Sequence, residues 1–100
     1  MEVNLDREIN NFDGSKLREI TVKAILLQYL GTFSHNDGAK MIRAYKLGQL
    51  VFDGSGNMSF DDKDVEIIRE ALKKPQHIAI VYAQICDIFG VNGENKDGEI

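Results

Sequence analysis

Cysteine, proline and tryptophan are scarce in this chain, which has one Cys, one Pro and no Trp in 100 residues. A single cysteine cannot form an intrachain disulfide, and Cys86 lies in an apolar helical stretch where a buried thiol is usual. The nucleotide-binding patterns GxxxxGK[ST] and GxGxxG and the hydrolase pattern GxSxG are absent. His35 and His77 have no second histidine or cysteine at metal-ligand spacing. We therefore expect no enzyme activity, no cofactor and no metal site.

Basic residues are also fewer than acidic ones, which gives a formal net charge of -4 and a sequence pI of about 5.1. A field of this sign disfavours nonspecific binding to phosphate backbones and anionic membranes. Lys40, Arg43 and Lys46 form a short basic strip beside Tyr45, but such strips are more often solvated helix faces. The apolar stretches are too short to span a bilayer, and no secretory signal follows Met1. We expect neither nucleic acid, membrane nor a small-molecule substrate as a partner.

The length and composition indicate one folded domain. Hydrophobic residues make up 43% and charged residues 28% of the chain, which are ordinary globular values. A chain of this size is too short to divide into two parts that each bury a core. The last ten residues are mainly Gly, Asn, Asp, Glu and Lys. We therefore expect a single helical domain over residues 1–90 and a disordered tail over residues 91–100.

An N-terminal hairpin is predicted from alternation and a turn. Val3, Leu5 and Ile9 alternate with polar residues, as in a strand with one buried face. Asp13-Gly14-Ser15 is a turn sequence, and residues 17–20 provide the returning strand. The chain thus begins with a strand that runs from Val3 to Ile9 and pairs with the segment after the turn.

Helical spacing of apolar residues follows in four segments. The first helix begins after Thr21 and ends at Gly31, and either Asn36 or Asp37 caps the second. The third begins at Asp61, with Asp64 completing a capping box.

Pro75 suits the first turn of the fourth helix, which ends at Gly90 and, being apolar nearly all round, is expected to be the buried centre. A brief extended segment over residues 58–60 precedes the third helix. The predicted fold class is α+β, mainly α: a small bundle of about four helices with an N-terminal β-hairpin.

The second helix has more apolar surface than one contact requires. One face is predicted for the core, with Gly48 allowing close approach of another helix; its residues are Met41, Ala44, Tyr45, Gly48, Val51 and Phe52. Leu47 and Leu50 lie outside this stripe. We interpret Leu47 and Leu50 as candidate partner-binding residues.

The segment after the second helix has the pattern of a degenerate EF-hand loop. The residues at ligand positions three, five, seven, nine and twelve are Asp53, Ser55, Asn57, Ser59 and Asp62. The first ligand position is held by Val51, and Asp62 is shorter than the usual bidentate glutamate. We expect millimolar calcium affinity or none, since polar turns use the same residues.

Three segments together resemble small uncharacterised proteins of tailed bacteriophages and prophages: Ile20 to Leu30 (ITVKAILLQYL), Arg43 to Phe52 (RAYKLGQLVF) and Phe60 to Phe89 (FDDKDVEIIREAL and VYAQICDIF). The resemblance implies a phage origin, an accessory or assembly-related role, and a location in the host cytoplasm or the virion. It transfers no functional residue.

The sequence therefore predicts a phage protein-interaction module without catalytic activity, acting through a protein partner or self-association. Two alternatives stay open. One is a degenerate EF-hand-like calcium-binding module, and the other is a small phage regulator that binds a host protein.

Overall fold

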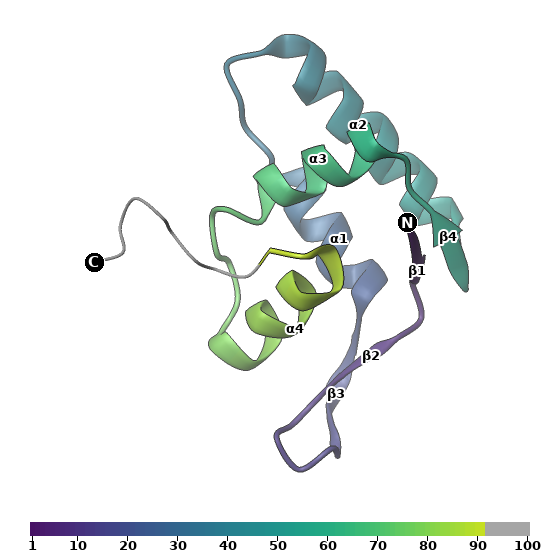
Figure 1. Cartoon of the computed structure of the whole chain (residues 1–100), viewed down its shortest axis with the longest axis vertical. Helices are drawn as coiled ribbons and strands as arrows, with labels where there is room; N and C mark the ends of the chain where they lie inside the picture. Colours follow the sequence, from purple (N-terminus) through teal and green to yellow (C-terminus); the bar gives the residue numbers. More distant parts are fainter. Residues whose placement is uncertain (92–100) are drawn as a thin grey trace.

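The computed structural model describes residues 1–91, except for the side chains of residues 18 and 19. The fold is α+β and mainly α, as the sequence predicts, with four described helices and four short strands (Figure 1). The elements are β1 (Glu2–Asn4), β2 (Glu8–Asn10), β3 (Lys16–Thr21), α1 (Val22–Gly31), α2 (Gly38–Asp53), β4 (Asn57–Ser59), α3 (Asp62–Ala71) and α4 (Ala79–Phe89). The predicted tail lies outside the described residues beyond Val91.

The hairpin is present, but its first strand is shorter than predicted. β2 pairs antiparallel with β3, and the turn between them contains Gly14 at a φ of 89°. A single strand from Val3 to Ile9 is a wrong prediction, because the chain turns after Asn4, whose side-chain oxygen accepts a hydrogen bond of 3.0 Å from the Asp6 amide. Val3, Leu5 and Ile9 are nevertheless all buried.

The turn after Asn4 frees β1 to pair with a strand from the middle of the chain. β1 and β4 form a second antiparallel pair, in which Val3 faces Met58. The extended segment predicted near Met58 to Phe60 is therefore a strand, and its partner is the N-terminus. This pairing places the N-terminal strand beside the strand that connects α2 to α3 (Figure 1).

Helices α1 and α2 begin at the predicted caps. The Thr21 side chain accepts a hydrogen bond of 3.2 Å from the Ala24 amide, and the Asp37 side chain accepts one of 2.9 Å from Ala39. Asp37, rather than Asn36, is therefore the cap of α2. The capping box of α3 is also confirmed, with both reciprocal bonds between Asp61 and Asp64 present.

Helix α4 begins later than predicted, at Ala79 instead of near Pro75. The intervening segment makes tertiary hydrogen bonds: the Gln76 amide donates to the Tyr29 hydroxyl at 2.8 Å, and the Gln76 side chain donates to Thr32 at 2.7 Å. Contacts with α1 thus replace the first helical turn. The helix ends as predicted at Gly90, which has a left-handed φ of 74°.

The centre of the core is α1, and the expectation that α4 occupies it is wrong. Five α1 residues are buried: Val22, Ile25, Leu26, Tyr29 and Leu30. α1 packs against α2, α3 and β3, whereas α4 packs against α3 and β2. Because neighbours cover only part of α4, Ala83 and Asp87 remain exposed. Within residues 1–91, no helix combines the length and apolar character that crossing a membrane requires.

Candidate protein-binding groove

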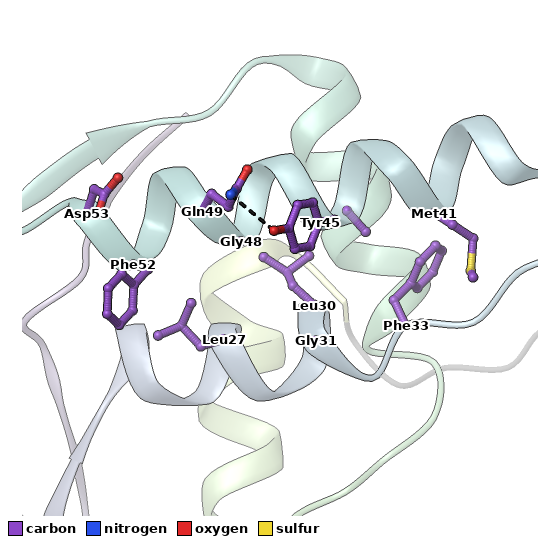
Figure 2. Close-up of a pocket in the computed structure, with 11 residues that line it drawn as sticks. Leu27, Leu30, Gly31, Phe33, Met41, Tyr45, Gly48, Gln49, Phe52 and Asp53 are labelled. Carbon is purple, nitrogen blue, oxygen red and sulfur yellow. Dashed lines mark hydrogen bonds between the residues drawn. The ribbon is translucent and has the colours of Figure 1, made fainter.

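A mainly apolar groove of about 480 Å³ lies between α1 and α2 (Figure 2). Both helices contribute its walls, and the segment after α1 closes one end. The lining residues are Leu27, Leu30, Gly31, Phe33, Met41, Ala44, Tyr45, Gly48, Gln49, Phe52 and Asp53. Asp53 is the single formally charged residue among them.

The α2 wall is a stripe with spacings of four, three and four residues: Met41, Tyr45, Gly48 and Phe52. This spacing keeps the four residues on one side of a helix. Tyr45 is 65% exposed and Phe52 67% exposed, so the prediction that they lie in the core is wrong. Ala44 and Val51, which lie at one edge of the predicted apolar face, are the residues that are buried in the core.

Gly48 creates the gap at the middle of this wall. A Cβ atom added to Gly48 lies 3.8 Å from the Cβ atom of Leu30, which confirms the predicted close approach of two helices. Figure 2 shows the Leu30 side chain of α1 lying between the two helices beside Gly48. The groove therefore has a bulky Tyr45 beside an empty position.

Neighbouring groups hold the exposed aromatic side chains of the groove. The Gln49 side-chain amide donates a hydrogen bond of 3.2 Å to the Tyr45 hydroxyl. The Lys23 ammonium lies 5.7 Å from the centre of the Phe52 ring and donates a hydrogen bond of 2.8 Å to the Gly54 carbonyl. These contacts already restrict the rotamers of Tyr45 and Phe52, so fewer rotamers are lost when a partner binds. The entropic cost of binding is therefore reduced.

The other end of the groove is ordered by His35. Its ring stacks on Phe33 with centroids 5.8 Å apart, and its backbone amide donates to the Met41 sulfur at 3.2 Å. The His35 Nε2 atom lies 3.2 Å from a carboxylate oxygen of Glu70 on α3. Through His35, the segment between α1 and α2 therefore contacts both α2 and α3.

The two leucines predicted as partner contacts lie in different environments. Leu47 is only 2% exposed and belongs to the core, so its predicted exposure outside the buried stripe is wrong. The reason is that α3 also packs against α2. Leu50 is 60% exposed and stays a candidate contact, in a separate hollow that also contains Ile42 and Lys46.

Two members of the basic strip join α2 to α3. Lys40 is 2.9 Å from Glu70, and Arg43 lies 3.2 Å from Asp61 and 3.0 Å from Asp64. The hydrogen bond from Lys40 lowers the pKa of the Glu70 carboxyl. These cations are therefore paired within the chain instead of being displayed for phosphate.

The EF-hand-like segment forms the turn between α2 and α3. The five residues at the other ligand positions are all exposed: Asp53, Ser55, Asn57, Ser59 and Asp62. Val51 is fully buried, so no ligand from that position reaches solvent. Within the described residues, no three His, Cys, Asp or Glu side chains are arranged to hold a metal ion.

The single thiol lacks the surroundings of an activated nucleophile. Cys86 is 4% exposed, and burial raises its pKa, which disfavours the thiolate. Burial also raises the pKa of the neighbouring Tyr82 to about 12, and the Tyr82 hydroxyl donates to the Leu72 carbonyl. His77 does not lie in a helix, and its Nδ1 atom is 3.3 Å from the Tyr29 hydroxyl.

Comparison with known proteins adds no family to this description: no family model, curated protein or solved structure matches the chain. Sequence reasoning missed the groove because its position depends on how α1 covers α2. The available signal was the four-three-four spacing of Met41, Tyr45, Gly48 and Phe52, which indicates an apolar stripe but not which of its edges is covered.

Proposed function

We propose that this protein is a protein-interaction module without catalytic activity, which binds a polypeptide in the α1–α2 groove. The observation that carries the proposal is the concentration of exposed apolar side chains. Eight large hydrophobic residues are exposed in the described part of the chain, and five of them lie on α2: Met41, Ile42, Tyr45, Leu50 and Phe52. Scattered exposed residues are normal, but apolar residues gathered on one side of a helix, as Met41, Tyr45 and Phe52 are in the groove, mark a contact surface.

Of the two apolar surfaces of α2, the groove side is a stronger candidate for binding than the hollow around Leu50. It presents Tyr45 and Phe52, and aromatic side chains are enriched among the residues that dominate binding energy. Its concave shape lets a partner contact both α1 and α2, as in helix-in-groove recognition. The opposite side offers only Ile42 and Leu50 among its exposed large apolar residues.

Several features favour binding over catalysis. The buried Cys86 has a raised pKa, and the His35 and Glu70 side chains contact each other beside Lys40. These groups therefore serve packing and attachment between helices. An accessory or assembly-related phage role, in the host cytoplasm or the virion, is supported by the three-segment resemblance. The same groove also suits the alternative of a regulator that binds a host protein.

Affinity capture from phage-infected bacterial cells tests the proposal with three forms of the tagged chain. These are the wild type, the double variant Tyr45→Glu/Phe52→Glu, and the control Leu50→Glu, which adds a charge on the other side of α2. We expect a defined polypeptide to be captured by the wild type and Leu50→Glu but lost with the double variant. Circular dichroism establishes that all three are folded.

Equal capture by all three forms contradicts a binding role for the groove. Loss with Leu50→Glu alone assigns the contact to the surface around Leu50 and Ile42 instead. The two surfaces are therefore distinguished by one experiment.

A further inference from the structure

We infer that the polypeptide in the groove is a second copy of this chain, with the two α2 helices packed antiparallel about a two-fold axis. The α1–α2 pairs of both copies then form a four-helix bundle. This inference rests on the proposed function of the groove and names its occupant.

The stripe on α2 is complementary to itself in this orientation. An antiparallel pair centred between residues 46 and 47 places Tyr45 opposite Gly48 of the second copy and Met41 opposite Phe52 of the second copy. The exposed Tyr45 ring then fills the gap that Gly48 leaves, and the two-fold axis repeats this contact. Alternating spacings of three and four residues are also those of the seams in antiparallel helix bundles.

Electrostatics agree with the antiparallel orientation. Gln49, the exposed α2 residue that lines the groove between Tyr45 and Phe52, is uncharged, so the middle of the contact brings no like charges together despite the net charge of -4. Asp53 lies at the C-terminal end of α2, and a 16-residue helix is about 24 Å long. Antiparallel packing therefore keeps the two Asp53 carboxylates apart by more than the Debye length of about 8 Å.

The two exposed aromatic rings supply part of the area that a dimer needs. Tyr45 and Phe52 expose 65% and 67% of their surface. Since an aromatic side chain covers roughly 150–250 Å², these rings offer about 250 Å² per copy and about 500 Å² in the pair. That is about half of the roughly 1,000 Å² needed by a specific interface. Met41, Leu27 and Phe33 add further lining surface, so we expect association that depends on concentration.

Sedimentation velocity of the untagged full chain measures the association. We expect the apparent mass to rise with concentration toward twice the 11.2 kDa of one chain. Tyr45→Glu should keep the protein monomeric, whereas Leu50→Glu should dimerise like the wild type. A wild type that stays monomeric at its highest soluble concentration, or a dimer lost with Leu50→Glu but not with Tyr45→Glu, overturns the inference.

Disulfide trapping tests the orientation in a Cys86→Ser background. Tyr45→Cys and Gly48→Cys chains are prepared separately, one with a tag that changes its mass, and then mixed under mild oxidation. Gly48→Cys is sterically acceptable because the nearest atom to the new Cβ is 3.8 Å away. We expect cross-linking chiefly between the two different chains. Preferential cross-linking within either single-variant sample indicates another orientation and overturns the antiparallel register.

The two proposals fail in different ways. A monomeric wild type that still loses a captured phage or host polypeptide with Tyr45→Glu/Phe52→Glu rejects the second copy but supports the groove. A monomer whose capture is insensitive to those changes rejects both.

Discussion

The Tyr29 hydroxyl on α1 accepts a hydrogen bond of 2.8 Å from the backbone amide of Gln76, which lies in the segment before α4. The Tyr29 ring is only 1% exposed and lies 5.4 Å from the His77 ring, measured between centroids. This bond joins α1 to a part of the chain far away in sequence. It explains why residues near Pro75 are not the first turn of α4.

Tyr29→Phe should lower the free energy of unfolding by about 1 kcal/mol, because the Gln76 amide loses its acceptor while the ring remains packed. Urea denaturation measures the change. Tyr45→Phe is the matched control, since Tyr45 is exposed and its hydroxyl accepts a hydrogen bond from the exposed Gln49 side chain. Equal effects of the two substitutions contradict a structural role for the Tyr29 bond.

Ile85→Ala should destabilise the fold by roughly 2–5 kcal/mol, because deletion of a buried aliphatic side chain leaves a cavity. Ile85 is fully buried on α4. Ile78→Ala provides the control, since Ile78 is 68% exposed and its truncation should change stability by less than about 0.5 kcal/mol. Chemical denaturation of both variants measures the free energy of unfolding. A decrease below about 0.5 kcal/mol for Ile85→Ala contradicts the burial of Ile85 in the core.

Two leucines on α2 should respond differently to the same change. Leu47→Ala should cost roughly 2–5 kcal/mol because Leu47 is in the core, whereas Leu50→Ala should cost less than about 0.5 kcal/mol because Leu50 is exposed. Thermal melting at a low protein concentration, where self-association is minimal, compares them. Similar melting temperatures for the two variants are incompatible with this burial of α2.

Glu70 should make stability depend on pH in the acid range. The hydrogen bond from Lys40 holds the pKa of the Glu70 carboxyl below its ordinary value of 4.5, with His35 and Lys73 contributing in the same direction. The stabilisation is therefore present above about pH 4.5 and is lost as the pH falls through the lower folded-state pKa.

Glu70→Gln should accordingly have a lower melting temperature than the wild type near neutral pH, and the difference should shrink as the solution is acidified. Melting curves across this range provide the measurement. Glu66→Gln is the control, since Glu66 lies on the same helix and is exposed. A difference that is constant with pH contradicts the assignment.

Calcium at physiological intracellular levels should not bind the turn between α2 and α3. Val51 is fully buried at the first ligand position, and the Asp62 side chain is too short for the usual bidentate contact. Isothermal titration calorimetry measures the affinity. A dissociation constant in the micromolar range that is abolished by Asp53→Ala supports the calcium-binding alternative instead.

Local interactions made much of this fold predictable. The caps at Thr21 and Asp61, the turn at Gly14 and the helix end at Gly90 depend on groups within a few residues of one another, and their preferences are present in the sequence. Apolar spacing likewise identified most of the buried residues, because a helix or strand places such residues on one face.

The sequence by itself determined where most helices begin and end and that α2 carries more apolar surface than one neighbour covers. Only the tertiary structure decided that Leu47 is covered while Tyr45 and Phe52 remain exposed. It also decided that β1 pairs with β4 and that Gln76 bonds to Tyr29. These outcomes depend on which distant elements come together, and burial of a given side chain is set by its neighbours in space. The groove follows from that packing, because its walls come from α1 and α2, which lie against each other where Gly48 meets Leu30.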